Sequence, residues 1–146
     1  MFESILVGTD GSDAAGAAVA RAVRLAAALG ARLQIVSAYE PVPERHLRIA
    51  RVHVPSDVQV NMREEVLTLL EACRRDAEAA SVVAVETFAR VGDAADAILD
   101  VAEEQSSDLI VVGNKGMTGA TRFLLGSVPN KVSHHAPCSV LIVRAG

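Results

Sequence analysis

Residues 109–116 read Leu-Ile-Val-Val-Gly-Asn-Lys-Gly, and this stretch decides the fold class. Four consecutive large apolar residues predict a strand over residues 109–112 that is buried on both faces, because a strand with one solvated face alternates apolar and polar side chains. The glycines that follow indicate a turn where this strand ends. Strands buried on both faces are typical of parallel sheets that helices cover on either side.

Strand and helix patterns alternate along the rest of the chain. Short apolar runs predict four further strands, over residues 5–7, 33–38, 82–88 and 139–143. Apolar residues spaced by three or four predict helices over residues 13–29 and 58–80, and from residues 93 and 127 onward. This order of elements predicts a single α/β domain over residues 1–146. Its expected form is a doubly wound, Rossmann-like, five-stranded parallel sheet with strand order 3-2-1-4-5 and helices on both faces.

Composition and charge exclude several classes of function. The net charge of −4 argues against a nucleic-acid partner, which usually requires a basic face. No run approaches 18 apolar residues, so no membrane-spanning helix is expected. The chain starts without the basic, apolar and small-residue order of a signal peptide, and we expect a cytoplasmic protein. Cys73 and Cys138 lack the spacing of a zinc site and are expected to be reduced structural thiols.

Two loops are expected to meet at one edge of the predicted sheet. In a doubly wound sheet, ligands bind at the carboxyl ends of the strands beside the point where the strand order reverses. The strand over residues 5–7 delivers Thr9, Asp10 and Gly11 to that edge, and the strand over residues 109–112 delivers the glycine-rich residues 113–116. Because glycines let the backbone approach an anion closely, these loops predict a ligand site.

A phosphate group is expected at the helix that begins near residue 127. The free amides and the dipole at the start of a helix favour an anion there. Ser127 either caps this helix or donates its hydroxyl to a phosphate oxygen. The Asp10 carboxylate would repel a polyphosphate unless a cation lay between them, and Mg²⁺, which prefers oxygen ligands, meets this requirement.

The same residues resemble those of a known family. The spacing Gly113-x2-Gly116-x9-Gly126-Ser127 is similar to the ATP loop of universal stress proteins of the nucleotide-binding type. Residues 5–12 and 137–143 resemble the first and last strands of that family, so the resemblance covers essentially the whole chain. It departs from the family at residues 114 and 115, which are Asn-Lys where many relatives have Ser-His or Arg-Gly.

The resemblance implies a set of positions that contact an adenine nucleotide. In that set, Asp10 meets the phosphate or Mg²⁺ region, Ala38 and Val112 border the adenine and ribose, and the residues from 126 to 128 bind phosphate. The complete set is Thr9, Asp10, Ala38, Val112, Gly113, Gly116, Gly126, Ser127 and Val128. Replacing Gly113 or Gly126 by Val is expected to abolish binding and to leave the fold intact.

Several functional alternatives stay open on the sequence. The favoured reading is a stress-response sensor or regulator that binds ATP with Mg²⁺. The alternatives are a protein that binds cyclic AMP, a slow ATPase, a nucleotide-free interaction protein on the same fold, and a flavin carrier of the flavodoxin type. The chain has no Gly-Lys-Ser/Thr triplet, so efficient ATP turnover is not supported. It also has no Trp and one Tyr, which disfavours flavin stacking.

Single residues have alternative roles as well. Asp10 and Ser12 could form only an Asx turn and a helix cap. The glycine-rich residues after the fourth strand could form a surface loop without a ligand.

The last strand is expected to pair two copies of the chain into a homodimer. Ser139–Val143 contains no charge, Pro or Gly, and it lies at one edge of the sheet in the inferred strand order. An apolar edge strand is a template for pairing unless something covers it. A two-fold related copy can pair antiparallel with it, and the family resemblance implies the same interface. The alternative is that residues 40–57 cover this edge within one chain.

Overall fold

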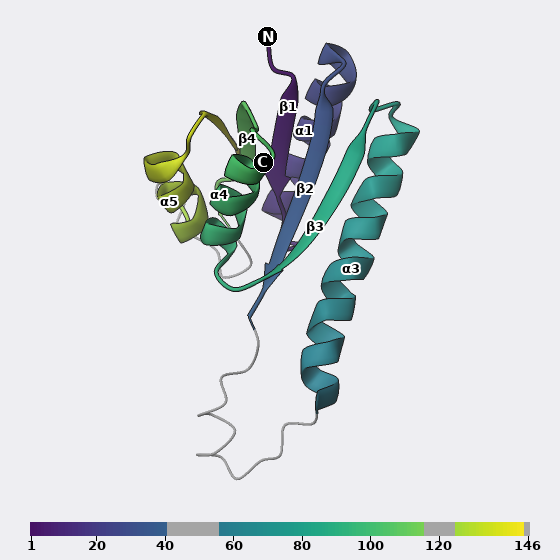
Figure 1. Cartoon of the computed structure of the whole chain (residues 1–146), viewed down its shortest axis with the longest axis vertical. Coiled ribbons are helices and arrows are strands. Elements are labelled where there is room, and N and C mark those ends of the chain that lie inside the picture. The colour runs from purple at the N-terminus through teal and green to yellow at the C-terminus, as the bar shows by residue number, and fades with distance from the viewer. Residues whose placement is uncertain (41–55, 116–124, 145–146) are drawn as a thin grey trace.

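The protein forms a parallel sheet between two layers of helices (Figure 1). This computed structural model describes residues 1–40, 56–115 and 125–144. The elements in chain order are β1 (Ser4–Gly8), α1 (Asp13–Leu29), β2 (Arg32–Tyr39), α3 (Ser56–Ala79), β3 (Val85–Val91), α4 (Ala94–Glu104), β4 (Leu109–Gly113), α5 (Ser127–His135) and β5 (Ser139–Val143). Among the described residues, no helix combines the length and the apolar character that crossing a bilayer requires.

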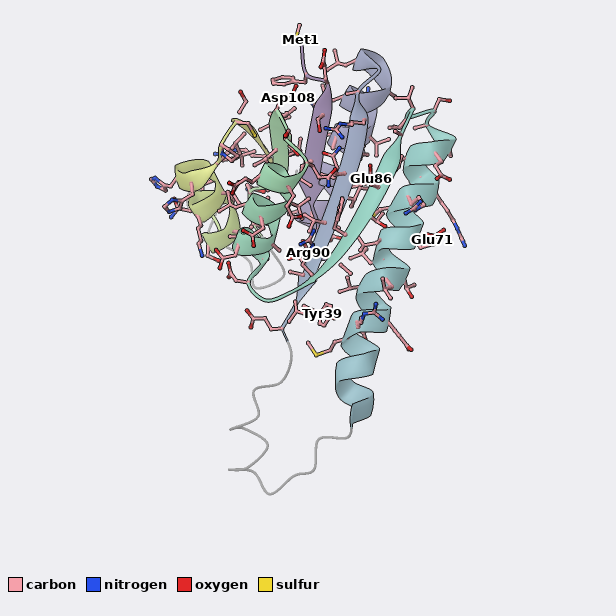
Figure 2. The ribbon with its side chains drawn as sticks, viewed as in Figure 1. Met1, Tyr39, Glu71, Glu86, Arg90 and Asp108 are labelled. Carbon is pink, nitrogen blue, oxygen red and sulfur yellow. The ribbon has the colours of Figure 1, made fainter. Side chains whose placement is uncertain are left out.

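The five strands confirm the predicted order. All pairs are parallel, and the sheet runs β3-β2-β1-β4-β5. The strand order reverses between β1 and β4, where Ile5 pairs with Leu109 and Val7 with Val111. Tyr39 lies at the carboxyl end of the sheet, and Met1 and Asp108 lie at the opposite end (Figure 2). The doubly wound, Rossmann-like fold expected from the sequence is therefore present.

The sheet has a separate apolar core on each face, which explains the continuous apolar strands. Ile5 and Val7 pack against α1 and α3, whereas Leu6, between them, packs against α4 and α5. All three side chains are fully buried. Burial of a side chain of this size contributes about 1.5–3 kcal/mol. A polar residue at any of these positions would therefore face one core or the other.

The third strand begins later than its sequence predicts. A strand over residues 82–88 was expected from β-branched content, but β3 spans Val85–Val91. Ser81 adopts φ 67°, and the backbone N–H of Val82 donates to the Ala77 carbonyl, 3.2 Å away. Val82 thus belongs to the turn that ends α3, where its side chain is buried in the core. Apolar burial in a helix-terminal turn gives the same sequence signal as a strand.

Candidate functional site

The segment after β1 turns sharply at the carboxyl edge of the sheet. Thr9 is buried, and its backbone N–H donates to the Val36 carbonyl of β2 at 3.0 Å. The Thr9 Oγ1 accepts from the backbone N–H of Gly11 at 3.2 Å. Gly11 has φ +82°, a conformation that strongly favours glycine, so this turn depends on it. The turn places Asp10 on the surface, directly before α1.

Asp10 and Ser12 make the local hydrogen bonds that the sequence left open as an alternative. The Asp10 Oδ1 accepts from the Ser12 N–H at 2.9 Å, which is an Asx turn. The Ser12 Oγ accepts from the Ala15 N–H at 3.2 Å and caps α1. These contacts orient the carboxylate of Asp10, whose side chain is exposed at the candidate site. Within the described ranges, no three His, Cys, Asp or Glu side chains gather to hold a metal ion, and Mg²⁺ at Asp10 stays a prediction.

Gly113 ends β4 against the first turn of α1. A Cβ at this position would lie 2.8 Å from the Ala14 carbonyl oxygen and 2.9 Å from its carbon. Backbone atoms cannot move aside as a flexible side chain can, so only glycine fits. The expectation that Gly113→Val leaves the fold intact is therefore wrong, because the substitution would push β4 away from α1.

The start of α5 lies on the segment that follows β4. The backbone N–H of Gly126 donates to the Asn114 carbonyl at 2.9 Å, and the N–H of Asn114 donates to the Val143 carbonyl at 3.0 Å. A Cβ on Gly126 would lie 3.2 Å from the Lys115 Cα. Because φ of Gly126 is −63°, this glycine serves close approach and not an unusual backbone conformation. The ends of β4 and β5 and the beginning of α5 thus form one hydrogen-bonded unit.

Gly126, and not Ser127, occupies the N-cap position of α5, which corrects the expected cap. The Asn130 N–H donates to the Gly126 carbonyl at 3.2 Å and closes the first helical turn. Ser127 is therefore the first helical residue, and it is exposed. Its hydroxyl does not cap the helix, and its contact with a phosphate stays a prediction.

The helices α1 and α5 both begin at this edge of the sheet, and they differ in which groups accept hydrogen bonds from the backbone N–H groups of their first turns. The first backbone N–H groups of any helix lack intrahelical acceptors. In α1 the Ser12 side chain accepts one of them. In α5 the N-cap is glycine, which has no side chain, and the backbone N–H groups of Ser127 and Val128 lie in the first turn. An anion is favoured at α5, because the amides and the helix dipole act together there.

The structure brings most of the predicted contact positions to this edge of the sheet. Ala38 is half-buried next to the end of β2, and Val128 lies at the start of α5, where it packs against the core. Val112 is only 2% exposed, so its side chain belongs to the core and only its main chain can border a ligand. Gly116 lies outside the described residues.

Comparisons with known proteins identify the family of the chain. The sequence pattern of the universal stress protein family matches residues 1–144. The chain belongs to the universal stress protein family. It is 39% identical to universal stress protein Rv1636 of Mycobacterium tuberculosis over 143 residues, covering 98% of this chain and 97% of that one. It is 38% identical to universal stress protein YxiE of Bacillus subtilis over 149 residues, covering 99% and 100%.

Solved structures of universal stress proteins share the fold. The universal stress protein UspA of Lactobacillus plantarum superposes with a TM-score of 0.85 at 27% identity, covering 98% of both chains. A universal stress protein solved in complex with cAMP superposes with a TM-score of 0.75 at 32% identity, covering 99% of both chains. A ligand-bound relative is thus similar to this universal stress protein over the whole length.

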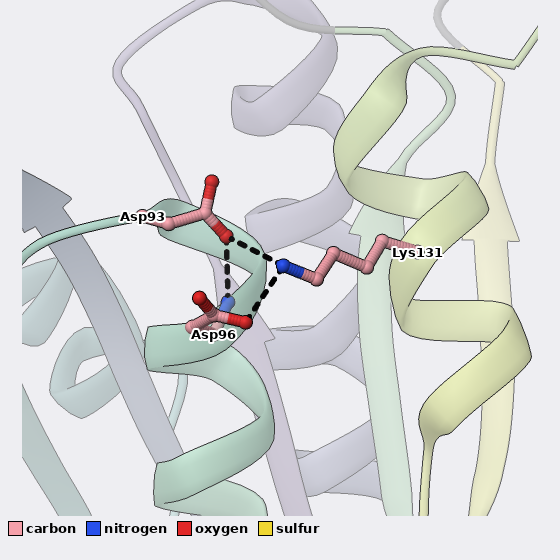
Figure 3. A network of polar contacts seen from close by, with 3 residues as sticks. All are labelled: Asp93, Asp96 and Lys131. Atoms are coloured by element: carbon pink, nitrogen blue, oxygen red, sulfur yellow. Dashed lines mark hydrogen bonds and ion pairs between the residues drawn. The ribbon is translucent and has the colours of Figure 1, made fainter.

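An ion-pair network beside the site was not found from the sequence (Figure 3). The Nζ of Lys131, on α5, lies 2.8 Å from Asp96 Oδ1 and 3.4 Å from Asp93 Oδ2, both at the start of α4. Asp93 also caps α4 by accepting from the Asp96 N–H at 3.0 Å. That backbone hydrogen bond lowers the pKa of Asp93, burial opposes it, and Lys131 lowers it further. The hydrogen bond to Asp96 raises the pKa of Lys131, burial opposes it, and Asp93 raises it further.

Proposed function

We propose that this universal stress protein binds an adenine nucleotide, ATP with Mg²⁺, at the carboxyl ends of β1 and β4, and acts as a stress-response sensor or regulator. The observation that carries the proposal is the glycine-capped start of α5 at the point where the strand order reverses. Its first-turn amides lie on the segment that follows Gly113, and ligands of doubly wound sheets bind at this point. The relative in complex with cAMP supports an adenine nucleotide as the ligand class.

Mg²⁺ enters the proposal because of charge. Asp10 and Asp13 flank the turn before α1, and both side chains are exposed. Their carboxylates would repel the phosphates of ATP in the absence of a cation. Mg²⁺ binds through one or two carboxylates together with substrate phosphates, and Asp10 supplies a carboxylate that its own Asx turn orients.

Cyclic AMP is the alternative ligand, and one observation favours it. The relative in complex with cAMP is 32% identical over nearly the whole chain. A cyclic monophosphate carries one negative charge and would need less cation screening beside Asp10 than ATP. The dependence of binding on Mg²⁺ therefore separates the two ligands.

We propose binding without efficient hydrolysis. Turnover requires a general base within hydrogen-bond reach of the attacking water. The histidines in the described part of the chain, His134 and His135, lie at the far end of α5 from Ser127. A slow ATPase stays the alternative, and release of phosphate from bound ATP measures it.

The proposed ligand is tested by the change in Tm that it causes. A ligand at 100 times its dissociation constant adds about 2.7 kcal/mol to the free energy of unfolding. For a domain of this size, that raises Tm by roughly 5–11 °C. ATP with Mg²⁺ is expected to raise Tm in this range, and GTP with Mg²⁺ serves as the control for base recognition. If neither ATP with Mg²⁺ nor cAMP changes Tm or gives heat in a calorimetric titration, the proposed function is wrong.

We also propose that two copies pair through β5. This strand is at one edge of the sheet, and none of its side chains is charged. The other edge strand, β3, carries an exposed Glu86 and an Arg90 that pairs with Glu104 at 3.1 Å. Charged side chains on an edge oppose strand pairing, so the β5 edge is favoured over the β3 edge. The cytoplasmic location expected from the sequence stays a prediction.

A further inference from the structure

The nine-residue helix α5 contacts the rest of the described chain at its inner side, at its start and through Lys131. On its inner side, Val132 is fully buried and Pro129 is buried. At its start, the Gly126 N–H donates to the Asn114 carbonyl. The polar contact to another helix comes from Lys131, whose ammonium reaches both Asp93 and Asp96 on α4. Among the described residues, the contacts that orient α5 are therefore an apolar surface, a backbone hydrogen bond at its start and this ion-pair network.

Lys131 is close to the first turn that the proposed function requires. It follows Ser127 by four residues, so it lies on the same side of the helix and about 6 Å further along the axis. Figure 3 shows its side chain extending from α5 across to the start of α4. With two carboxylates as partners, the ammonium is directed to α4 and not to the first-turn amides.

Exposed ion pairs contribute little to global stability, so this network is expected to add little to the free energy of unfolding. All three side chains are about half-exposed. A contact that fixes a short helix can still change ligand affinity, because apparent affinity falls with the fraction of molecules in the binding-competent orientation.

We propose that Lys131 is a positioning residue: by pairing with Asp93 and Asp96, it holds α5 in the orientation that presents the amides of Ser127 and Val128 to the phosphate. This inference rests on the proposed function. The class of ligand is the phosphate group of an adenine nucleotide, and Lys131 acts on it through α5 and not by direct contact.

A direct electrostatic effect makes the opposite prediction for one variant. Removing a carboxylate near the site raises the local potential, which would strengthen binding of an anion. If Asp96 instead serves to hold Lys131, its removal loosens α5 and weakens binding. The sign of the change in Asp96→Asn thus separates the two explanations. Asp100→Asn is the matched control, because Asp100 is an exposed carboxylate on the same helix with no ion pair among the described residues.

The experiment measures the Kd of ATP with Mg²⁺ by calorimetry for the wild type, Asp96→Asn, Asp100→Asn, Lys131→Met and the double variant Lys131→Met/Asp96→Asn. We expect Asp96→Asn and Lys131→Met to bind about two- to fivefold more weakly, the range that an exposed ion pair can supply. Asp100→Asn should bind as tightly as the wild type or more tightly. In the Lys131→Met background, Asp96→Asn should cause no further loss, because the contact is already absent.

Hydrogen exchange gives a readout that does not depend on the ligand. In Lys131→Met without nucleotide, amides of α5 should exchange faster, while amides of α1 should not change. Binding by Asp96→Asn as tight as that of Asp100→Asn, or unchanged exchange in α5, overturns the positioning role and leaves the proposed function standing. If the wild type binds neither ATP nor cAMP, the proposed function fails, and the positioning role fails with it.

Discussion

A Cβ on Gly113 would lie 2.8 Å from the carbonyl oxygen of Ala14, so the end of β4 and the first turn of α1 are in backbone contact. Gly113→Ala is expected to destabilise the fold by about 1–3 kcal/mol, because the backbone must shift to admit the methyl group. Gly16→Ala is the control. Gly16 is helical, and a methyl group there would have open space within 4 Å, so the change should stabilise by about 0.5–1 kcal/mol. Urea unfolding measures both, and equal effects would contradict the packing role of Gly113.

Gly126 offers the cleaner test of the site. Its φ of −63° suits any residue, and a Cβ would meet the Lys115 Cα at 3.2 Å, which a shift of a few tenths of an ångström relieves. Gly126→Val should therefore fold cooperatively, while its side chain obstructs approach to the first-turn amides of α5. Loss of nucleotide binding with a near-normal urea midpoint is the expected result. A well-folded variant with unchanged affinity would place the nucleotide elsewhere.

Asp10→Asn removes the charge of Asp10 and keeps its Asx turn, since an Asn side-chain oxygen can also accept from the Ser12 N–H. The variant should lose much of the Mg²⁺ dependence of ATP binding and change cAMP affinity less, because cAMP carries less charge. Calorimetric titrations with and without Mg²⁺ compare the two ligands. An equal loss for ATP and cAMP would show that Asp10 has only its structural role.

Leu141→Lys should convert a dimer into a monomer. Leu141 is half-buried on β5, so a charge there opposes pairing of two edges with limited damage to the core, whereas Val143 is buried and unsuitable for this test. The chain mass is 15.3 kDa, and light scattering of the wild type should give about twice this value. Ala89→Lys, half-buried on the opposite edge strand, is the control and should stay dimeric. A wild-type mass of one chain at high concentration would contradict the dimer.

The pKa shifts at the start of α4 predict a defined pH dependence. The folded pKa of Asp93 is lowered, so its stabilising contribution is complete above its unfolded pKa of about 3.9 and is lost as the pH falls through the folded pKa. Asp93→Asn keeps the cap, because Asn caps helices as well as Asp does. The difference in unfolding free energy between the wild type and this variant should be constant near neutrality and vanish in acid. A difference in unfolding free energy between the two proteins that persists below the folded pKa of Asp93 would contradict this prediction.

Lys131 gives the complementary dependence. The pKa of Lys131 is raised in the folded state. Its contribution to the free energy of unfolding is therefore complete below its unfolded pKa of about 10.4 and is lost as the pH rises through the folded pKa.

The strand order and helix layers were predictable because they follow from local periodicity. The strands β1, β4 and β5 are apolar runs, and the single reversal of order agrees with the rules for right-handed crossovers. The predicted start of β3 was wrong because Val82 is buried in a helix-terminal turn. Apolar periodicity cannot distinguish such a turn from a strand. The option that Ser127 caps α5 was wrong because a hydrogen bond to Asn114 fixes Gly126 at the N-cap. Local helix propensity does not reveal a contact between residues this far apart in the chain.

The described positions of the predicted contact set lie at one edge of the sheet, and their contact with a ligand stays a prediction, whereas the network around Lys131 was missed. Its partner Asp93 is 38 residues away in the chain, and each residue alone reads as an ordinary surface charge. Gly113 shows the converse limit. Its place in a glycine-rich loop pattern predicted that the backbone there approaches a ligand. The close contact of Gly113 with Ala14 arises only when α1 packs against β4, so the local sequence could not reveal it.

The central pairing of β1 with β4 joins residues that are about a hundred positions apart, since Ile5 is opposite Leu109. Closing a loop of this length early in folding is entropically unfavourable, and parallel sheets with such contacts fold more slowly than helical proteins of similar size. The candidate site lies across that same pairing, so neither half of the chain can form it alone. A ligand bound there would hold together the two ends of the sequence, and it would slow the separation of β1 from β4 that unfolding requires.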